Sequence, residues 1–223
     1  RHETVEAQLR MVKTLGFAGW ACSLPDSGEE TLALADSLGL KLFTVYTDVN
    51  IDGKQPPWNP ALPDAIRLLK GHGTQIWLIV TGSKYPAGSK AGDEQAVEIV
   101  RRVADMAAES GVGVSLYPHN GNYIASVRDA LRILRKADRS NLSVTFNLCH
   151  WLKVDRGQDI DAILREAMPH LSFVSINGAD NGGMDWDRLI QPLGQGTYDV
   201  YDLLLRLKGL GYQGPIGLMC YAV

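Results

Sequence analysis

Short apolar runs alternate with amphipathic segments from one end of the chain to the other. The runs are rich in β-branched residues, which is typical of buried strands, and the segments between them place apolar residues at helical spacing. The predicted strands cover residues 17–22, 41–46, 75–80, 112–119, 142–150, 171–177 and 216–221. The predicted helices cover residues 4–15, 27–37, 61–70, 93–110, 123–137, 158–167 and 198–208. Strands that alternate with helices of this length form βαβ crossovers and a parallel sheet.

One strand and one helix recur about every 30 residues, which suits an eight-stranded (β/α)8 TIM barrel. A helix precedes the first predicted strand, so we expect an α/β barrel whose own first strand lies upstream of Arg1. The alternative is a doubly wound open sheet, which needs a glycine-rich phosphate turn after an early strand. Gly194 and Gly196 lie in a late loop and do not supply that turn. No linker divides the chain, so residues 1–223 are expected to form a single domain.

Two histidines, His119 and His150, close consecutive predicted strands. Neighbouring strands of a parallel barrel bring their C-terminal ends to one rim, so we expect the two imidazoles to share a site there. The near-neutral pKa of imidazole suits proton transfer, and the neutral ring also binds divalent metals. The alternative is that each histidine only satisfies a hydrogen bond at a strand end. The equivalent positions of the two histidines favour a functional site.

Other polar side chains follow the same predicted strand ends. A rim of hydroxyl, amide and imidazole groups suits a polyhydroxylated ligand that both donates and accepts hydrogen bonds. The predicted substrate-binding residues are Tyr117, Asn147, Asn177, Asp180, Gln191, Gln195 and Tyr221. The alternative is that strand ends are polar in any barrel, because loops begin there. Trp20 and Trp151 are candidate platforms for sugar stacking, whereas core packing is expected for Trp77.

Composition and charge exclude several classes of partner. The net charge is −3, and the basic residues are scattered instead of forming a stripe, so no nucleic-acid partner is expected. No apolar run approaches the roughly 18 residues of a membrane span, so no membrane partner is expected. Cys22, Cys149 and Cys220 are far apart and form no disulfide framework, which favours a reducing compartment such as the cytoplasm. The chain opens within a helix, so a secretory signal upstream of Arg1 stays an alternative, and a homo-oligomer is left open.

The chain resembles the xylose-isomerase-like TIM barrel superfamily, which includes sugar phosphate isomerases and epimerases. The resemblance extends from the first helix to Tyr221 and rests on four runs that look like the family's strand-end and loop motifs. These runs are Tyr117–His119, Asn147–His150, Val174–Asn177 and Pro192–Gly196. The resemblance implies isomerisation, epimerisation, or related keto-sugar lyase and dehydratase chemistry on a small carbohydrate. It also implies a divalent metal (Mn, Mg, Zn or Co) that polarises oxygens of the sugar while protein groups move a proton.

The sequence departs from that family's pattern at the metal ligands. The family holds its metal with Glu, Asp, His and Glu at four strand ends, and the matching residues here are Tyr117, Asn147, Ser175 and Met219. Magnesium and manganese prefer carboxylates, and none of these four side chains is one. Only the accompanying His119 and His150 match. Three alternatives follow: the two histidines bind the metal, the chemistry is metal-free, or catalysis has been lost.

Two functions from different classes are therefore predicted. The first is a sugar isomerase, epimerase or keto-sugar lyase in which His119 and His150 are acid/base groups or metal ligands. Lys153 is the third predicted catalytic residue, because its charge would stabilise an enediolate. The second is a catalytically silent barrel that binds a carbohydrate or a partner protein.

Overall fold

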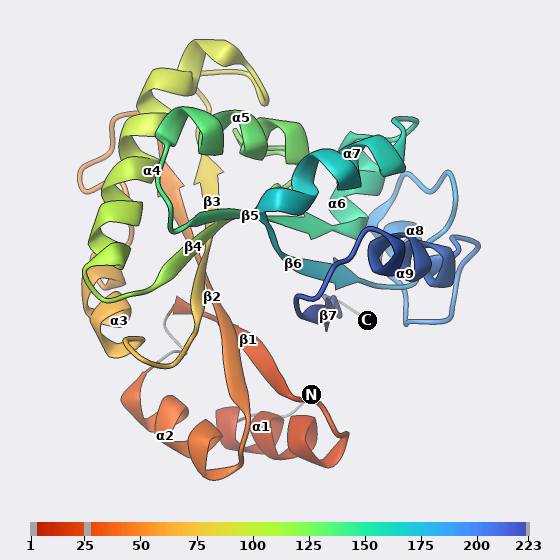
Figure 1. Cartoon of the computed structure of the whole chain (residues 1–223), viewed down its shortest axis with the longest axis horizontal. Coiled ribbons are helices and arrows are strands. Elements are labelled where there is room, and N and C mark those ends of the chain that lie inside the picture. Colours follow the sequence, from red (N-terminus) through yellow and green to blue (C-terminus); the bar gives the residue numbers. More distant parts are fainter. Residues whose placement is uncertain (1–3, 25–27, 222–223) are drawn as a thin grey trace.

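The computed structural model describes residues 4–24 and 28–221 of the chain. Seven parallel strands lie side by side in sequence order and curve into a nearly closed barrel (Figure 1). The strands are β1 (Gly19–Ser23), β2 (Lys41–Asn50), β3 (Gln75–Thr81), β4 (Gly113–Leu116), β5 (Leu142–Asn147), β6 (Leu171–Ile176) and β7 (Ile216–Leu218). β1 and β7 form the two edges of the sheet, where one more strand would close the barrel. This arrangement confirms the predicted α/β barrel that lacks one strand.

Helices connect the strands and cover the outer face of the barrel (Figure 1). They are α1 (Val5–Thr14), α2 (Glu29–Ser37), α3 (Leu62–Leu68), α4 (Asp93–Ala108), α5 (Val127–Ala137), α6 (Leu148–Val154), α7 (Ile160–Ala167), α8 (Trp186–Leu189) and α9 (Val200–Gly209). α4 and α5 pack against β4 and β5 through apolar residues at helical spacing. Within residues 4–24 and 28–221, no helix is long and apolar enough to cross a membrane.

Side chains of the strands alternate between the two faces of the barrel wall. On β3, Ile76, Leu78 and Val80 belong to the large core that the helices cover, whereas Trp77 and Ile79 belong to a separate cluster inside the barrel. The run is apolar throughout because both faces of a parallel barrel strand are buried. The barrel interior therefore carries a different set of side chains from the outer core.

A buried charge cluster holds the start of α4 against α5. The Asp93 carboxylate is only 3 % exposed and accepts hydrogen bonds from Arg132 at 3.1 Å, Lys136 at 2.6 Å and the Tyr123 hydroxyl at 2.8 Å. A buried carboxylate is stable only when cations and hydrogen-bond donors surround it, as here. Because Tyr123 belongs to the loop between β4 and α5, the cluster also anchors that loop, which carries His119.

Three predicted boundaries beside the histidines are wrong. The strand predicted up to His119 ends at Leu116, so His119 lies in the loop after β4. The strand predicted up to His150 ends at Asn147, and α6 begins at Leu148, so His150 lies in the first turn of a helix. The first five residues of this short helix, Leu148–Leu152, are all buried, so no helical periodicity distinguished them from a strand. The helix predicted from residue 123 begins at Val127, since the Ser126 side chain and Asp129 form a capping box there.

Candidate active site

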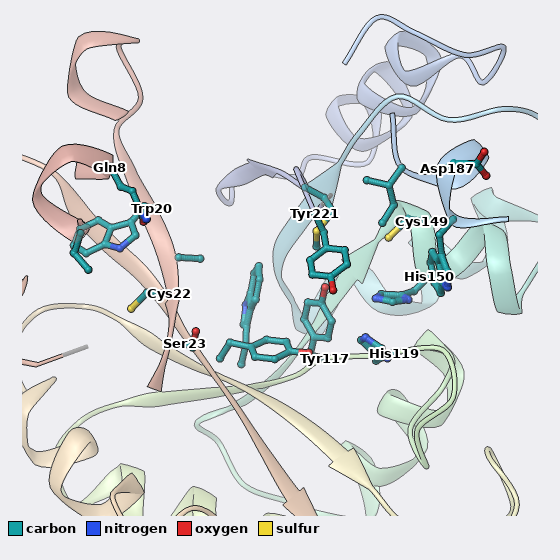
Figure 2. Close-up of a pocket in the computed structure, with 17 residues that line it drawn as sticks. Gln8, Trp20, Cys22, Ser23, Tyr117, His119, Cys149, His150, Asp187 and Tyr221 are labelled. Atoms are coloured by element: carbon teal, nitrogen blue, oxygen red, sulfur yellow. The ribbon is translucent and has the colours of Figure 1, made fainter. Parts of the chain in front are cut away.

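A cavity of about 1050 Å³ lies inside the barrel. One wall comes from α1 and β1 and includes Gln8, Trp20 and Cys22. The opposite wall comes from the segments that follow β4 and β5, and it includes His119 and His150 (Figure 2). The histidine side of the cavity therefore lies where the segments after two neighbouring strands meet, which is the usual place of an active site in this class of barrel.

Aromatic rings from successive strands form the floor of the cavity. We call Phe43, Tyr46, Trp77, Tyr117 and Phe173 the inner aromatic cluster. The Trp77 ring centroid lies 4.8 Å from that of Phe173 and 5.0 Å from that of Tyr117, and Tyr46 meets Tyr117 edge to face at 5.5 Å. Edge-to-face and tilted pairs at these distances are favourable. The floor is therefore aromatic, with Tyr46, Trp77 and Tyr117 facing the cavity.

The structure brings His119 and His150 together in this cavity. Their ring centroids are 4.0 Å apart, with an angle of 44° between the planes (Figure 2). His119 lies in the loop after β4, and its backbone N–H donates to the carbonyl of Ile124 at 3.0 Å. His150 is 6 % exposed and meets the rings of Trp186 at 5.5 Å and Tyr117 at 5.9 Å. Both imidazoles can thus contact one small ligand.

The backbone of Asn120 links the two imidazoles. Its carbonyl oxygen lies 2.7 Å from Nδ1 of His119, and its N–H donates to Nδ1 of His150 at 3.3 Å. Burial lowers the pKa of His119 below its ordinary value of 6.5. Burial, helped by the neighbouring His119, lowers the pKa of His150 to about 3. Both rings are therefore neutral near pH 7, because a buried imidazole loses the hydration that its charged form needs.

A chain of neutral polar groups lies beside the histidines. The Asn147 side-chain amide donates to the Tyr117 hydroxyl, and the Cys149 thiol donates to Oδ1 of Asn147 at 3.0 Å. Burial raises the pKa of the Cys149 thiol to about 12 and the pKa of Tyr117 well above its ordinary value. Cys149 is therefore a hydrogen-bond donor in this chain and not a thiolate nucleophile. The neighbouring Ser175 hydroxyl is buried without a hydrogen-bond partner among the described residues.

These residues do not fit the divalent metal that the family resemblance implies. Within the described ranges, no three His, Cys, Asp or Glu side chains come together as a group that could hold a metal ion. Tyr117 and Asn147 are committed to each other, and both are neutral. A tight site for a hard divalent ion needs carboxylate oxygens, and two imidazoles by themselves do not replace them.

Lys153 lies outside the cavity lining, although the sequence predicts a catalytic role for it. Its ammonium group donates to the carbonyl of Met184 and lies 5.4 Å from the centroid of the Trp186 ring. Trp186 in turn lines the cavity and touches His150. Lys153 therefore supports the wall of the cavity from behind, and its predicted catalytic role stays a prediction.

Four predicted binding residues lie in the loop between β6 and α9, and each makes hydrogen bonds within that loop. The Asn177 side chain is buried and donates to the carbonyls of Gly178 and Leu189, both at 2.7 Å. Asp180 pairs with Arg188 at 3.0 Å. The remaining two, Gln191 and Gln195, make turn and bridge contacts inside the same loop. None of the four belongs to the described cavity lining, so their predicted contact with substrate stays a prediction.

Two glycines of the same loop, Gly178 and Gly196, lie where the loop backbone packs closely on itself. A Cβ on Gly196 would lie 2.1 Å from the carbonyl oxygen of Ala179, and a Cβ on Gly178 would lie 2.2 Å from that of Pro192. These glycines therefore allow two segments of the loop backbone to pack closely against each other. The group that approaches each glycine is a backbone carbonyl of the same loop, not a ligand.

Trp186 and Asp187 of α8 line the cavity, and the sequence analysis did not single out Trp186. The signal in the sequence was an isolated tryptophan inside a polar, glycine-rich loop. Core packing does not readily explain a tryptophan at such a position. Of the predicted stacking platforms, Trp20 lines the cavity, whereas Trp151 packs against Phe146 and Tyr198. Tyr221 also lines the cavity, near its exposed mouth.

A family model described as xylose isomerase-like TIM barrel matches residues 9–222. The chain belongs to this family. Comparison with curated proteins gives no match.

Solved structures share the fold at low sequence identity. The apo form of 3-keto-D-glucoside 4-epimerase from E. coli is 22 % identical, with a TM-score of 0.78 over 98 % of this chain and 88 % of that chain. D-psicose 3-epimerase with D-tagatose, from Clostridium cellulolyticum H10, is 19 % identical, with a TM-score of 0.74 over 100 % and 81 % of the two chains. The probable 3-DHS dehydratase of petrobactin synthesis from Bacillus anthracis is 12 % identical, with a TM-score of 0.78 over 98 % and 88 %. At these identities the likeness shows the fold alone.

Proposed function

We propose that the protein is a sugar isomerase or epimerase-like enzyme that moves a proton next to the carbonyl of a small carbohydrate. Related keto-sugar lyase or dehydratase chemistry begins with the same proton transfer. The observation that carries the proposal is the pair of neutral imidazoles, 4.0 Å apart, in one cavity of the barrel. A neutral imidazole accepts a proton at one nitrogen and donates one at the other, which is what this reaction requires.

The cavity suits an uncharged sugar. Among the described residues that line it, Asp187 is the carboxylate and there is no lysine or arginine. A phosphate or carboxylate group on the substrate would call for lysine or arginine, which the described lining does not contain. Trp20, Trp186 and Tyr221 offer flat apolar faces with a polar edge, which match the C–H and hydroxyl groups of a sugar ring.

The names of the structural neighbours support the proposed class of sugar isomerase or epimerase-like enzyme. Two of them are sugar epimerases by name, and the third is a probable dehydratase. Proteins named as sugar epimerases therefore share this fold, and the assignment to this chain depends on its own histidines.

The test is solvent deuterium incorporation into a panel of uncharged ketoses and keto-glycosides, followed by NMR or mass spectrometry. We expect exchange at a carbon next to the carbonyl, and a loss of roughly 100-fold or more in His119→Gln and in His150→Gln. His170→Gln is the matched control, because His170 precedes the N-terminal end of β6, away from the cavity. Absence of exchange with every sugar of the panel would count against the enzyme.

The second candidate is a barrel that binds a carbohydrate without converting it. The neutral residues at the family's metal positions, Tyr117 and Asn147, favour this alternative. Calorimetric binding of a sugar that is retained while no deuterium enters it would select binding over catalysis. Equal loss of binding and exchange in both histidine variants would show that the pair serves recognition.

A further inference from the structure

The hydrogen bonds of Asn120 impose different proton positions on the two imidazoles. A carbonyl oxygen only accepts, so the 2.7 Å contact between the Asn120 carbonyl and Nδ1 of His119 requires the proton of His119 on Nδ1. A backbone N–H only donates, so the 3.3 Å contact from the Asn120 N–H requires a lone pair on Nδ1 of His150. In a neutral imidazole the single proton then sits on Nε2 of His150.

We propose that His119 is the proton acceptor and His150 the hydrogen-bond donor of the active site, and that the backbone of Asn120, as a positioning residue, fixes these unlike roles. The proposal rests on the function proposed above for its chemistry. The assignment of opposite tautomers to the two rings depends only on the two hydrogen bonds of Asn120. A free Nε2 lone pair on His119 and an Nε2–H group on His150 are then presented from rings 4.0 Å apart.

The first chemical step follows from this arrangement. Nε2 of His119 takes the proton from the carbon next to the carbonyl, the C–H electron pair becomes a C=C bond, and the carbonyl π electrons move to oxygen. Nε2–H of His150 donates to that oxygen and stabilises its developing charge. His119 then returns its proton to the former carbonyl carbon, where the C=C electron pair forms the new C–H bond. The hydroxyl on the other carbon becomes the new carbonyl, and its proton moves to the former carbonyl oxygen, so the isomerisation needs no other reactant. Neutral imidazole is an adequate electrophile for such a step, since catalytic proton transfer next to a carbonyl is known to use it.

The burial of the pair supports the assignment. A low pKa keeps His150 neutral, so it keeps the lone pair that the Asn120 N–H requires. The other titratable groups around the pair are Tyr117 and Cys149, both held protonated by burial, and Asp187 of α8. Lys153 lies behind Trp186 and does not line the cavity.

The same tautomers oppose chelation of a metal by both rings. In neutral His150 the proton occupies Nε2, and the lone pair of Nδ1 accepts the hydrogen bond from the Asn120 N–H. No lone pair is then left for a metal. Metal binding would require the Asn120–His150 hydrogen bond to break, or a proton to leave Nε2. This gives a direct physical reason for the poor fit of the site to a divalent ion.

The test is a spectrum of the protein labelled with ¹⁵N-histidine, in which two-bond ¹⁵N–¹H couplings distinguish Nδ1–H from Nε2–H. Signals are assigned with His119→Gln and His150→Gln. At neutral pH we expect the Nδ1–H form for His119 and the Nε2–H form for His150. The same tautomer on both rings, or a protonated His150, would overturn the proposal. This readout needs no substrate, so it separates failure of the tautomer assignment from failure of the proposed function.

A pair of variants at one position tests the positioning role. Asn120→Pro removes the N–H donor and keeps the carbonyl, whereas Asn120→Ala keeps both backbone groups. We expect a mixture of tautomers for His150 in the proline variant and the unaltered tautomers in the alanine variant. Deuterium exchange in Asn120→Pro should fall by roughly tenfold or more in kcat. An unchanged His150 spectrum in the proline variant would overturn the positioning role of Asn120. If the proline variant does not fold, the wild-type spectrum still decides the tautomers of the two histidines.

Discussion

Asn147 donates its side-chain amide to the hydroxyl of Tyr117, and this bond joins the end of β5 to the segment after β4 inside the barrel. The two residues match positions where the family resemblance expects metal-binding carboxylates. A tyrosine and an asparagine satisfy each other there without a charge, and the Cys149 thiol satisfies the remaining oxygen of the amide. A neutral chain of hydrogen bonds therefore joins these two strand ends.

Tyr117→Phe should lower the free energy of unfolding by about 1–3 kcal/mol, since it leaves the buried amide of Asn147 without its acceptor. Urea denaturation measures the change. Tyr201→Phe is the control, because that side chain is 70 % exposed and should be nearly neutral. Equal stability of the two variants would mean that the amide finds another acceptor.

Lys153→Met should raise KM for a sugar substrate roughly tenfold, with a much smaller change in kcat. The reason is that Lys153 holds Met184 and Trp186 at the wall of the cavity and does not line the cavity itself. Steady-state kinetics of deuterium exchange separates the two parameters, and Lys208→Met on the exposed side of α9 is the control. A fall of kcat by roughly 100-fold at unchanged KM would instead support the catalytic role that the sequence predicted.

Asp155→Asn should gain stability relative to the wild type as the pH rises from 4 to 8. Burial, and then the charge of Asp129, raise the pKa of Asp155 to about 6 from its ordinary value of 3.8. The folded state therefore holds the proton more tightly than the unfolded state, so the contribution of this group to stability is present below pH 4 and lost as the pH rises through 6. The difference between wild type and variant should change by about 2–3 kcal/mol across that window, as measured by denaturation at several pH values. A difference that does not vary with pH would contradict the shifted pKa.

Asp93→Asn should cost about 3 kcal/mol of folding free energy, because it leaves Arg132 and Lys136 without their shared carboxylate. Asp64→Asn is the matched control, since Asp64 pairs with Arg67 on an exposed helix face and such pairs contribute about 0–1 kcal/mol. Thermal and urea denaturation measure both. The loop that carries His119 should also exchange its amide hydrogens faster in Asp93→Asn, because a neutral amide accepts a weaker hydrogen bond from the Tyr123 hydroxyl than the carboxylate does.

The order of strands and helices follows directly from the sequence pattern. The run Gln75–Thr81 is apolar on both faces, and the same pattern in the other runs indicates a parallel barrel. The boundaries beside the site did not follow, because Leu148–Leu152 is buried all round and reads equally well as strand or helix.

The sequence by itself determined the barrel and the neighbourhood of His119 and His150, because consecutive parallel strands must end side by side. Only the tertiary structure decided which polar groups face the cavity. Successive side chains alternate along a strand but turn by about 100° per residue along a helix, so the start of α6 at Leu148 sets the direction of His150. The same folding places the backbone of Asn120 between the two rings, and its hydrogen bond to His150 joins the loop after β4 to α6, a contact that no local pattern encodes.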